Sequence, residues 1–246
     1  MVHVFEIMSE IGSNCFLFAG PTLYGALELG LVPSAEIHVL PPVGRGDVQE
    51  VVSSFRPGVV VLVDGLFHQC LAVSHAEIRE AIAKGWMVWG LSSMGAIRAY
   101  EMRNLGVRGY GRVYECFLQH EDFRDDEVAL LHEPEPPYRP LSEPLVHIRY
   151  WLHELVETGL LAPTQQDQIL ESLMAMWFGE RTLKRVRGML KHLIPRHEDA
   201  VDAMIMNFDR FRVKSLDLFD FLRERCWKIT KCSTRRSRNS RPAETP

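Results

Sequence analysis

The stretch "WMVWGLSSMGAIRAYE" (residues 86–101) changes its pattern in the middle, and this change decides the fold. The first six residues, 86–91, form an apolar run that is typical of a strand buried on both faces. Apolar residues then recur at helical spacing over residues 94–100. Ser92 and Ser93 stand between the two patterns. The stretch therefore predicts a buried strand that turns into a helix, with two hydroxyl groups at the turn.

The same order of strand and helix recurs through the first half of the chain. A helix is predicted over residues 74–85, because Ser74 suits the N-cap, Glu77 is placed to complete a capping box and Gly85 suits the C-cap. Strands that alternate with helices predict a parallel sheet with crossover helices. We therefore expect an α/β fold, Rossmann-like or flavodoxin-like, with a helical region toward the C-terminus. The predicted strands are residues 15–19, 35–40, 59–63 and 86–91.

The second half of the chain has a different pattern. Residues 103–144 keep no period and become acidic and proline-rich, which predicts a long irregular loop. Amphipathic segments follow, so we expect an α/β core over 1–144, a helical region over 145–227 and a disordered basic tail over 228–246. The predicted helices of the helical region are residues 145–159, 164–179, 181–194, 197–211 and 214–227.

Length and composition limit the class of protein. The chain has 246 residues, of which 46% are hydrophobic and 24% charged, as in a globular protein. No apolar run reaches the roughly 20 residues of a membrane helix, and the first residues do not have the pattern of a secretory signal. We therefore expect a cytoplasmic protein without membrane contact. Five cysteines without a C-x-x-C pair indicate neither a disulfide framework nor a zinc site, and we expect no metal and no cofactor.

The charge is unevenly distributed. Residues 228–246 hold six basic residues and one acidic residue, while the rest of the chain holds 22 basic and 31 acidic residues. Such a tail is either solvated or docks on an acidic partner or nucleic acid. The acidic remainder argues against broad nucleic-acid binding.

The serine turn is the first candidate site. In open α/β sheets, ligands bind at the carboxyl ends of the strands, and the free N–H groups of the following helix favour an anion there. Ser93, with Gly95 two residues later, resembles a nucleophile elbow, although Gly90 lies one residue too far away for the G-x-S-x-G pattern. The alternative is that Ser92 and Ser93 only cap the helix. The sequence does not separate one serine from the other.

A nucleophilic serine needs a base, and several residues are candidates. Asp64 ends the strand before the predicted helix and His75 begins that helix, so we expect both at the same sheet edge as Ser93. Asp125 and Asp126 could instead orient a base, bind a metal or face solvent. Each of these side chains also has a non-catalytic interpretation, either as a helix or strand cap or as a solvent-exposed surface residue.

Three further charged residues lie near these candidates. Arg98 and Glu101 are three residues apart on the helix after the serines and can interact on one face. Arg149 lies on the first helix of the helical region, close to the irregular loop.

Several stretches taken together resemble the TfuA-like family, which is found beside YcaO enzymes. The resemblance covers roughly residues 15–160. The matching stretches are "FAGPTL" (18–23), "DGLF" (64–67), "HAEI" (75–78), "GLSSMGAIRAYE" (90–101), "GYGRVYE" (109–115), "DDEVALLH" (125–132) and "PLSEPLVHIR" (140–149). In one departure, Ala76 stands where the family often has lysine.

The resemblance implies an accessory role in YcaO-dependent modification of peptide backbones, chiefly thioamidation, as in trifolitoxin-type antibiotic biosynthesis. It implies hydrolysis of the C-terminal thiocarboxylate of a small ubiquitin-like sulfur carrier protein, which releases sulfide for the YcaO partner. The precursor peptide is a further candidate partner.

On this hypothesis Ser93 attacks the thioacid carbonyl, and hydrosulfide leaves. The candidate base and orienting groups are His75, Asp64 and the Asp125/Asp126 pair. The expected oxyanion and substrate-binding residues are Met94, Gly95, Arg98, Glu101, Gly20, Asp125 and Arg149.

Two other hypotheses stay open at this point. The protein could be a non-catalytic adaptor that binds YcaO and presents the carrier or the precursor peptide, with the serine turn as an anion site. It could also be a serine peptidase-like enzyme that cleaves the precursor peptide.

Overall fold

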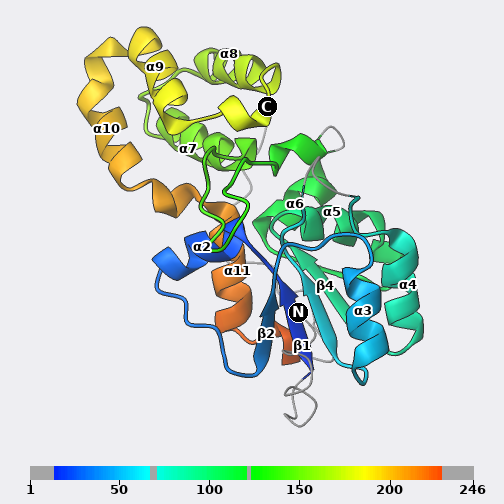
Figure 1. Ribbon diagram of the computed structural model, residues 1–246. Helices are drawn as coiled ribbons and strands as arrows, with labels where there is room; N and C mark the ends of the chain where they lie inside the picture. The colour runs from blue at the N-terminus through cyan, green and yellow to red at the C-terminus, as the bar shows by residue number, and fades with distance from the viewer. Residues whose placement is uncertain (1–13, 67–70, 121–122, 229–246) are drawn as a thin grey trace.

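The computed structural model describes residues 14–66, 71–120 and 123–228. At its centre is a five-stranded, all-parallel sheet in the order β2-β1-β3-β4-β5 (Figure 1). This confirms the predicted α/β fold, and the strand order is the flavodoxin-like one. The strands are β1 (Cys15–Phe18), β2 (Ile37–Leu40), β3 (Val59–Leu62), β4 (Met87–Leu91) and β5 (Arg108–Tyr110).

Helices cover both faces of the sheet, because alternate strand residues point to opposite sides. Phe16 and Phe18 face a core shared with α3 (Asp47–Ser54), α4 (His75–Ala83), α5 (Met94–Glu101) and α6 (Arg112–Gln119). Cys15 and Leu17 face the opposite core, which they share with α2 (Pro21–Glu28) and α11 (Val213–Arg223). Helix α11, the last α-helix of the described residues, therefore packs on the sheet, although more than a hundred residues separate it from β5.

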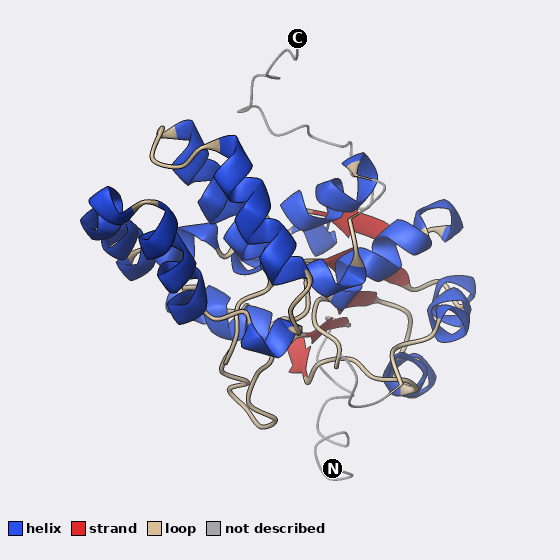
Figure 2. Cartoon of the chain, turned by 90° about the horizontal axis from the view of Figure 1, so that it is seen from above, coloured by secondary structure: helices blue, strands red, loops and turns tan. Residues whose placement is uncertain are grey.

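Four helices form a separate cluster beside the α/β layers, here called the helical lobe (Figures 1 and 2). They share an apolar core that includes Trp151, Leu155 and Leu190. The helices of the lobe are α7 (Leu145–Glu157), α8 (Pro163–Met174), α9 (Leu183–Leu193) and α10 (Glu198–Met206).

The predicted helix over residues 74–85 is α4, and its predicted capping box is present. The Ser74 hydroxyl accepts a hydrogen bond from the Glu77 N–H at 3.3 Å, and the Glu77 carboxylate accepts one from the Ser74 N–H at 2.5 Å. The helix ends at Ala83 with Lys84 as its C-cap, so the predicted C-cap Gly85, at a φ of 88°, lies one residue beyond the cap. Local sequence therefore determined this element.

The first part of the predicted irregular loop is wrong. Residues 103–120 contain strand β5 and helix α6. The strand has only three residues with Gly109 in the middle, so it shows no apolar alternation. A side chain at Gly109 would meet the ring of Tyr114 at 2.3 Å, so the glycine is required for α6 to fold back on the strand. Residues 123–144 are irregular as predicted, apart from a 3-10 turn at Asp125–Glu127.

Two further expectations concern membrane-spanning helices and the basic tail. Within the described ranges, no helix has both the length and the apolar character that crossing a membrane requires. The predicted basic tail lies outside the described residues except for Lys228, which pairs with Glu36.

Candidate functional site

The serine turn lies at the carboxyl end of β4 and is strained. The Ser93 N–H donates a hydrogen bond to the Leu91 carbonyl at 2.8 Å, which closes a three-residue turn around Ser92. Ser92 has a φ of 65°, a conformation that costs energy in a residue other than glycine. A γ-turn with positive φ at its central residue is rare. A strained turn between a strand and a helix resembles a nucleophile elbow, although the strained residue here is Ser92 and the elbow candidate Ser93 has a φ of −128°.

Two glycines let helix α5 pack directly on the sheet backbone behind this turn. A Cβ at Gly90 would lie 2.1 Å from the Gly95 carbonyl oxygen, and a Cβ at Gly95 would lie 1.8 Å from the Leu62 carbonyl oxygen. The Gly95 N–H also donates to the Val63 carbonyl at 3.1 Å. The close packing fixes the direction in which the two serines point.

Neither serine hydroxyl caps helix α5. Ser93 occupies the N-cap position but makes no side-chain cap hydrogen bond. Its Oγ lies 3.5 Å from the carbonyl oxygen of Val128, to which it donates. The Ser92 Oγ donates to the Lys214 carbonyl at 2.8 Å. Both serines are buried, so each hydroxyl is directed at another part of the chain rather than at its own helix.

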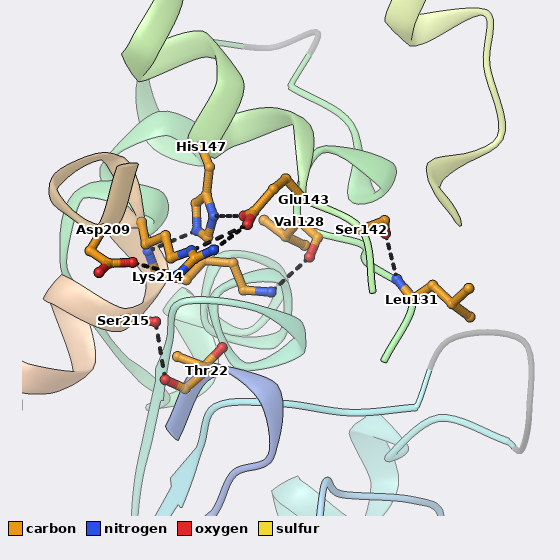
Figure 3. Close-up of polar contacts among 10 residues, drawn as sticks. Thr22, Val128, Leu131, Ser142, Glu143, His147, Asp209, Lys214 and Ser215 are labelled. Carbon is orange, nitrogen blue, oxygen red and sulfur yellow. Dashed lines mark hydrogen bonds and ion pairs between the residues drawn. The ribbon is translucent and has the colours of Figure 1, made fainter. Parts of the chain in front are cut away.

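A buried lysine completes this arrangement. The Lys214 Nζ donates to the Val128 carbonyl at 2.9 Å (Figure 3). Lys214 and Ser93 therefore share one acceptor oxygen. Burial lowers the pKa of Lys214 to about 8, and the nearby carboxylates of Asp64 and Glu143 raise it in part. A lysine with this pKa is partly neutral near physiological pH, which is a property of catalytic lysines.

Sequence reasoning missed Lys214, although the sequence contains a sign of it. In helix α11, Lys214 lies four and seven residues before Leu218 and Phe221, both of which pack on the sheet. A lysine on the apolar face of an amphipathic helix must be buried or snorkel to the surface. The Lys214 side chain is buried, with 1% of the residue exposed.

A polar network holds the backbone of Lys214 in place (Figure 3). The Lys214 N–H donates to His147 Nε2 at 3.4 Å, and His147 Nδ1 lies 3.0 Å from a Glu143 oxygen. Because Nε2 accepts a hydrogen bond, Nδ1 carries the proton and donates to Glu143. Burial lowers the pKa of His147 to about 4, so the imidazole is neutral at pH 7. Glu143 also binds Arg212 at 2.6 Å.

Asp64 and Gly20 meet at the switch point between β1 and β3. The Asp64 carboxylate accepts hydrogen bonds from the Gly20 N–H at 2.8 Å, the Thr22 N–H at 2.9 Å and the Thr22 hydroxyl at 2.6 Å. It therefore anchors the N-terminus of α2 to the end of β3. The Thr22 carbonyl in turn accepts from Ser215, the residue after Lys214, at 3.1 Å (Figure 3).

His75 belongs to a different cluster. Its Nε2 lies 2.9 Å from a Glu101 oxygen, and Arg98 pairs with the same oxygen at 2.5 Å. Arg98 also donates to the Val73 carbonyl at 3.0 Å. Burial and the charge of Glu101 raise the pKa of Asp125, while Arg98 lowers it. The structure thus groups His75, Arg98, Glu101 and Asp125 on the α4 and α5 side of the turn.

Two other acidic residues of the irregular segment bind arginines near or within the helical lobe. Asp126 pairs with Arg181 at 2.8 Å, and Arg181 is buried. Arg149 of α7 binds Glu127 through two hydrogen bonds, at 2.7 and 2.9 Å. Within residues 14–66, 71–120 and 123–228, no three His, Cys, Asp or Glu side chains are grouped so as to hold a metal ion.

A cavity of about 220 Å³ opens beside Lys214. Thr22 and Gly25 of α2 form one wall, and Leu130 and Pro140 of the irregular segment form another. The cavity is smaller than the roughly 300 Å³ at which pockets for drug-sized ligands begin. It therefore suits a slender group.

The flavodoxin-like sheet, with a strained serine turn and a buried lysine at its carboxyl edge, defines an α/β protein with polar groups gathered where ligands bind in such sheets. Residues 64–182 match the family model described as TfuA-like protein. The resemblance predicted from the sequence is thereby confirmed for residues 64–182, which form a TfuA-like segment of the chain. This family is associated with YcaO-dependent modification. No curated protein matches the chain.

The family match includes the serine turn, the irregular segment and the first two helices of the lobe. Strand β1, Gly20 and helix α11 with Lys214 lie outside it. The structure therefore joins residues of the family segment to a lysine from beyond it.

Proposed function

We propose that this protein hydrolyses the C-terminal thiocarboxylate of a ubiquitin-like sulfur carrier and supplies the sulfide to a YcaO enzyme for backbone thioamidation. The observation that carries the proposal is the meeting of the Ser93 hydroxyl and the Lys214 amine at one carbonyl oxygen, directly after a strained turn. The family match supports YcaO as the partner.

Lys214 is the base in this proposal. The sequence had offered His75, Asp64 or the Asp125/Asp126 pair for this role. The carboxylate of Asp64 is bound by the start of α2, Asp126 pairs with Arg181, and His75 pairs with Glu101. Lys214 shares an acceptor with Ser93, and a pKa of about 8 leaves a neutral fraction that can accept a proton. Serine and lysine are a known variant of the catalytic triad.

The reaction begins with neutral Lys214, which takes the proton of the Ser93 hydroxyl as Oγ attacks the thioacid carbon. An ester bond forms, the carbon–sulfur bond breaks with its electron pair on sulfur, and the proton passes from Lys214 to the sulfur, so that hydrosulfide leaves. Water then hydrolyses the ester, giving the carrier carboxylate, a proton and the Ser93 hydroxyl again. The Met94 N–H is the candidate oxyanion donor, because the Gly95 N–H already binds Val63.

The two serines have different roles in this mechanism. Ser93 is the nucleophile. Ser92 is a positioning residue, because its hydroxyl binds the carbonyl of Lys214 and so fixes the helix that carries the base.

The test is to mix the purified protein with a thiocarboxylated ubiquitin-like carrier and to follow both sulfide and the mass of the carrier. Ser93→Ala and Lys214→Met should each abolish release, while Ser172→Ala, which changes an exposed serine of α8, should not. Unchanged release by Ser93→Ala would remove the nucleophile assignment. No release by the wild type, with or without a YcaO enzyme, would remove the hydrolase.

The burial of Ser93 favours one other function, that of an adaptor. Only 2% of Ser93 is exposed, which suits a structural turn in a protein that presents the carrier to YcaO. An adaptor would bind the YcaO enzyme without releasing sulfide, and Ser93→Ala would leave that binding intact.

A further inference from the structure

The carbonyl oxygen of Val128 occupies the position where the proposed reaction needs a substrate atom. It accepts hydrogen bonds from the Lys214 amine at 2.9 Å and from the Ser93 hydroxyl at 3.5 Å. Both donors and the Val128 side chain are buried. A substrate oxygen or sulfur can reach these donors only if the carbonyl moves away.

Three contacts of residues 125–143, here called the cover segment, hold Val128 in place. Glu127, the residue before Val128, is bound by Arg149 through two hydrogen bonds. Asp126 is bound by Arg181. Farther along, the Leu131 N–H donates to the Ser142 hydroxyl at 2.8 Å (Figure 3). The helical lobe and the segment itself therefore fix the carbonyl.

The cavity of about 220 Å³ lies next to this place. Its lining includes Lys214 and also Leu130, two residues after Val128. Arg139 and Arg212 lie in its walls together with Glu28, Glu143 and Asp209. Each arginine is paired with a carboxylate, so an anionic chain end would have to share these cations with their partners. The cavity thus borders both the lysine that is the proposed base and the cover segment.

We propose that the Val128 carbonyl is an internal stand-in for substrate, and that the Lys214 and Ser93 donors bind the terminal thiocarboxylate of a slender peptide tail. The tail enters through the cavity and displaces the carbonyl as the cover segment moves. The inference rests on the proposed function. The free protein is consequently self-blocked, and weakening the anchors of the cover segment unblocks it.

The test measures how fast an amine-acetylating reagent modifies Lys214, with peptide mass spectrometry as the readout. In the wild type, Lys214 should react much more slowly than the exposed Lys84 of the same chain. Glu127→Gln weakens the pair with Arg149 and should raise the Lys214 rate about tenfold. Glu154→Gln is the matched control, because it removes an ion pair of the same helix α7, with Arg210, that does not touch the cover segment.

A second variant approaches the cover segment from its other end. Ser142→Ala removes the acceptor of the Leu131 N–H and should also raise the Lys214 rate. In Glu127→Gln, a short peptide that ends in glycine thiocarboxylate should protect Lys214 again. The same peptide with a terminal leucine should protect it less, because the cavity is narrow.

The inference is overturned if wild-type Lys214 reacts as fast as Lys84, if neither variant changes its rate, or if the glycine peptide gives no protection. It stands if both variants expose Lys214 and the peptide protects it. Sulfide release is scored separately: protection without release removes the hydrolase and keeps the binding site. Faster sulfide release by Glu127→Gln than by the wild type supports both the hydrolase and the self-blocked state of the free protein.

Discussion

Replacing Lys214 with methionine should stabilise the protein while abolishing sulfide release. Lys214 is buried, and burial lowers its pKa from 10.5 to about 8. Each pKa unit corresponds to about 1.4 kcal/mol, so the charged lysine costs the folded state roughly 3 kcal/mol below pH 8. Losing the hydrogen bond to Val128 offsets about 1 kcal/mol. We expect a net gain of about 2 kcal/mol at pH 7, or roughly 4–8 °C in Tm.

The pH dependence of this gain is the sharper part of the prediction. Between about pH 8 and 10.5 the unfolded chain still binds the lysine proton and the folded chain has lost it. Wild-type stability therefore rises with pH through this range, because the unfolded state binds more protons. Lys214→Met lacks the titrating group, so its advantage is full below pH 8 and falls by about 1.4 kcal/mol per pH unit above it. The advantage reaches zero at about pH 9.5, and by about pH 10.5 the variant is less stable by about 1 kcal/mol, the value of the lost hydrogen bond.

Urea unfolding of both proteins from neutral pH to about pH 10.5 measures the difference. Lys84→Met is the control, because Lys84 is exposed and pairs only with Glu80 across one helical turn, and its effect should stay within about 0.5 kcal/mol at every pH. A Lys214→Met protein that is less stable than the wild type at pH 7, or a difference that does not vary with pH, would refute a buried, titrating lysine.

The remaining predictions concern the turn, the switch point and the base. Ser92→Ala should cost about 1–2 kcal/mol in urea unfolding and slow sulfide release, because the Lys214 carbonyl loses its donor; a neutral change would contradict the positioning role. Asp64→Asn should cost roughly 2–3 kcal/mol, because the charged acceptor of Gly20 and Thr22 is lost, and calorimetric melting measures it. In steady-state kinetics, kcat/KM should rise with pH and level off above about pH 8, where Lys214 is neutral. A profile that falls over this range would exclude lysine as the base.

The sequence by itself determined the elements whose causes are local. Apolar runs bounded by turn residues predicted β1 to β4, and Ser74 with Glu77 predicted the start of α4, because capping and strand burial depend on neighbouring residues. The alternation of these elements determined the parallel sheet. The serine turn was also found in the sequence, since a polar pair between a strand and a helix has a fixed place at the sheet edge.

Only the tertiary structure decided which groups face the serines. Ser92 and Lys214 are 122 residues apart, and helix α11 reaches the turn by packing on the sheet beside α2. The amphipathic pattern of α11 is compatible with any apolar surface, so the pattern does not predict which surface the helix covers. His75 is near Ser93 in the sequence, yet its partner is Glu101. Side-chain partners depend on packing between elements that are distant in the sequence. For that reason Lys214, the proposed base, could be identified only from the tertiary structure and not from the spacing of residues.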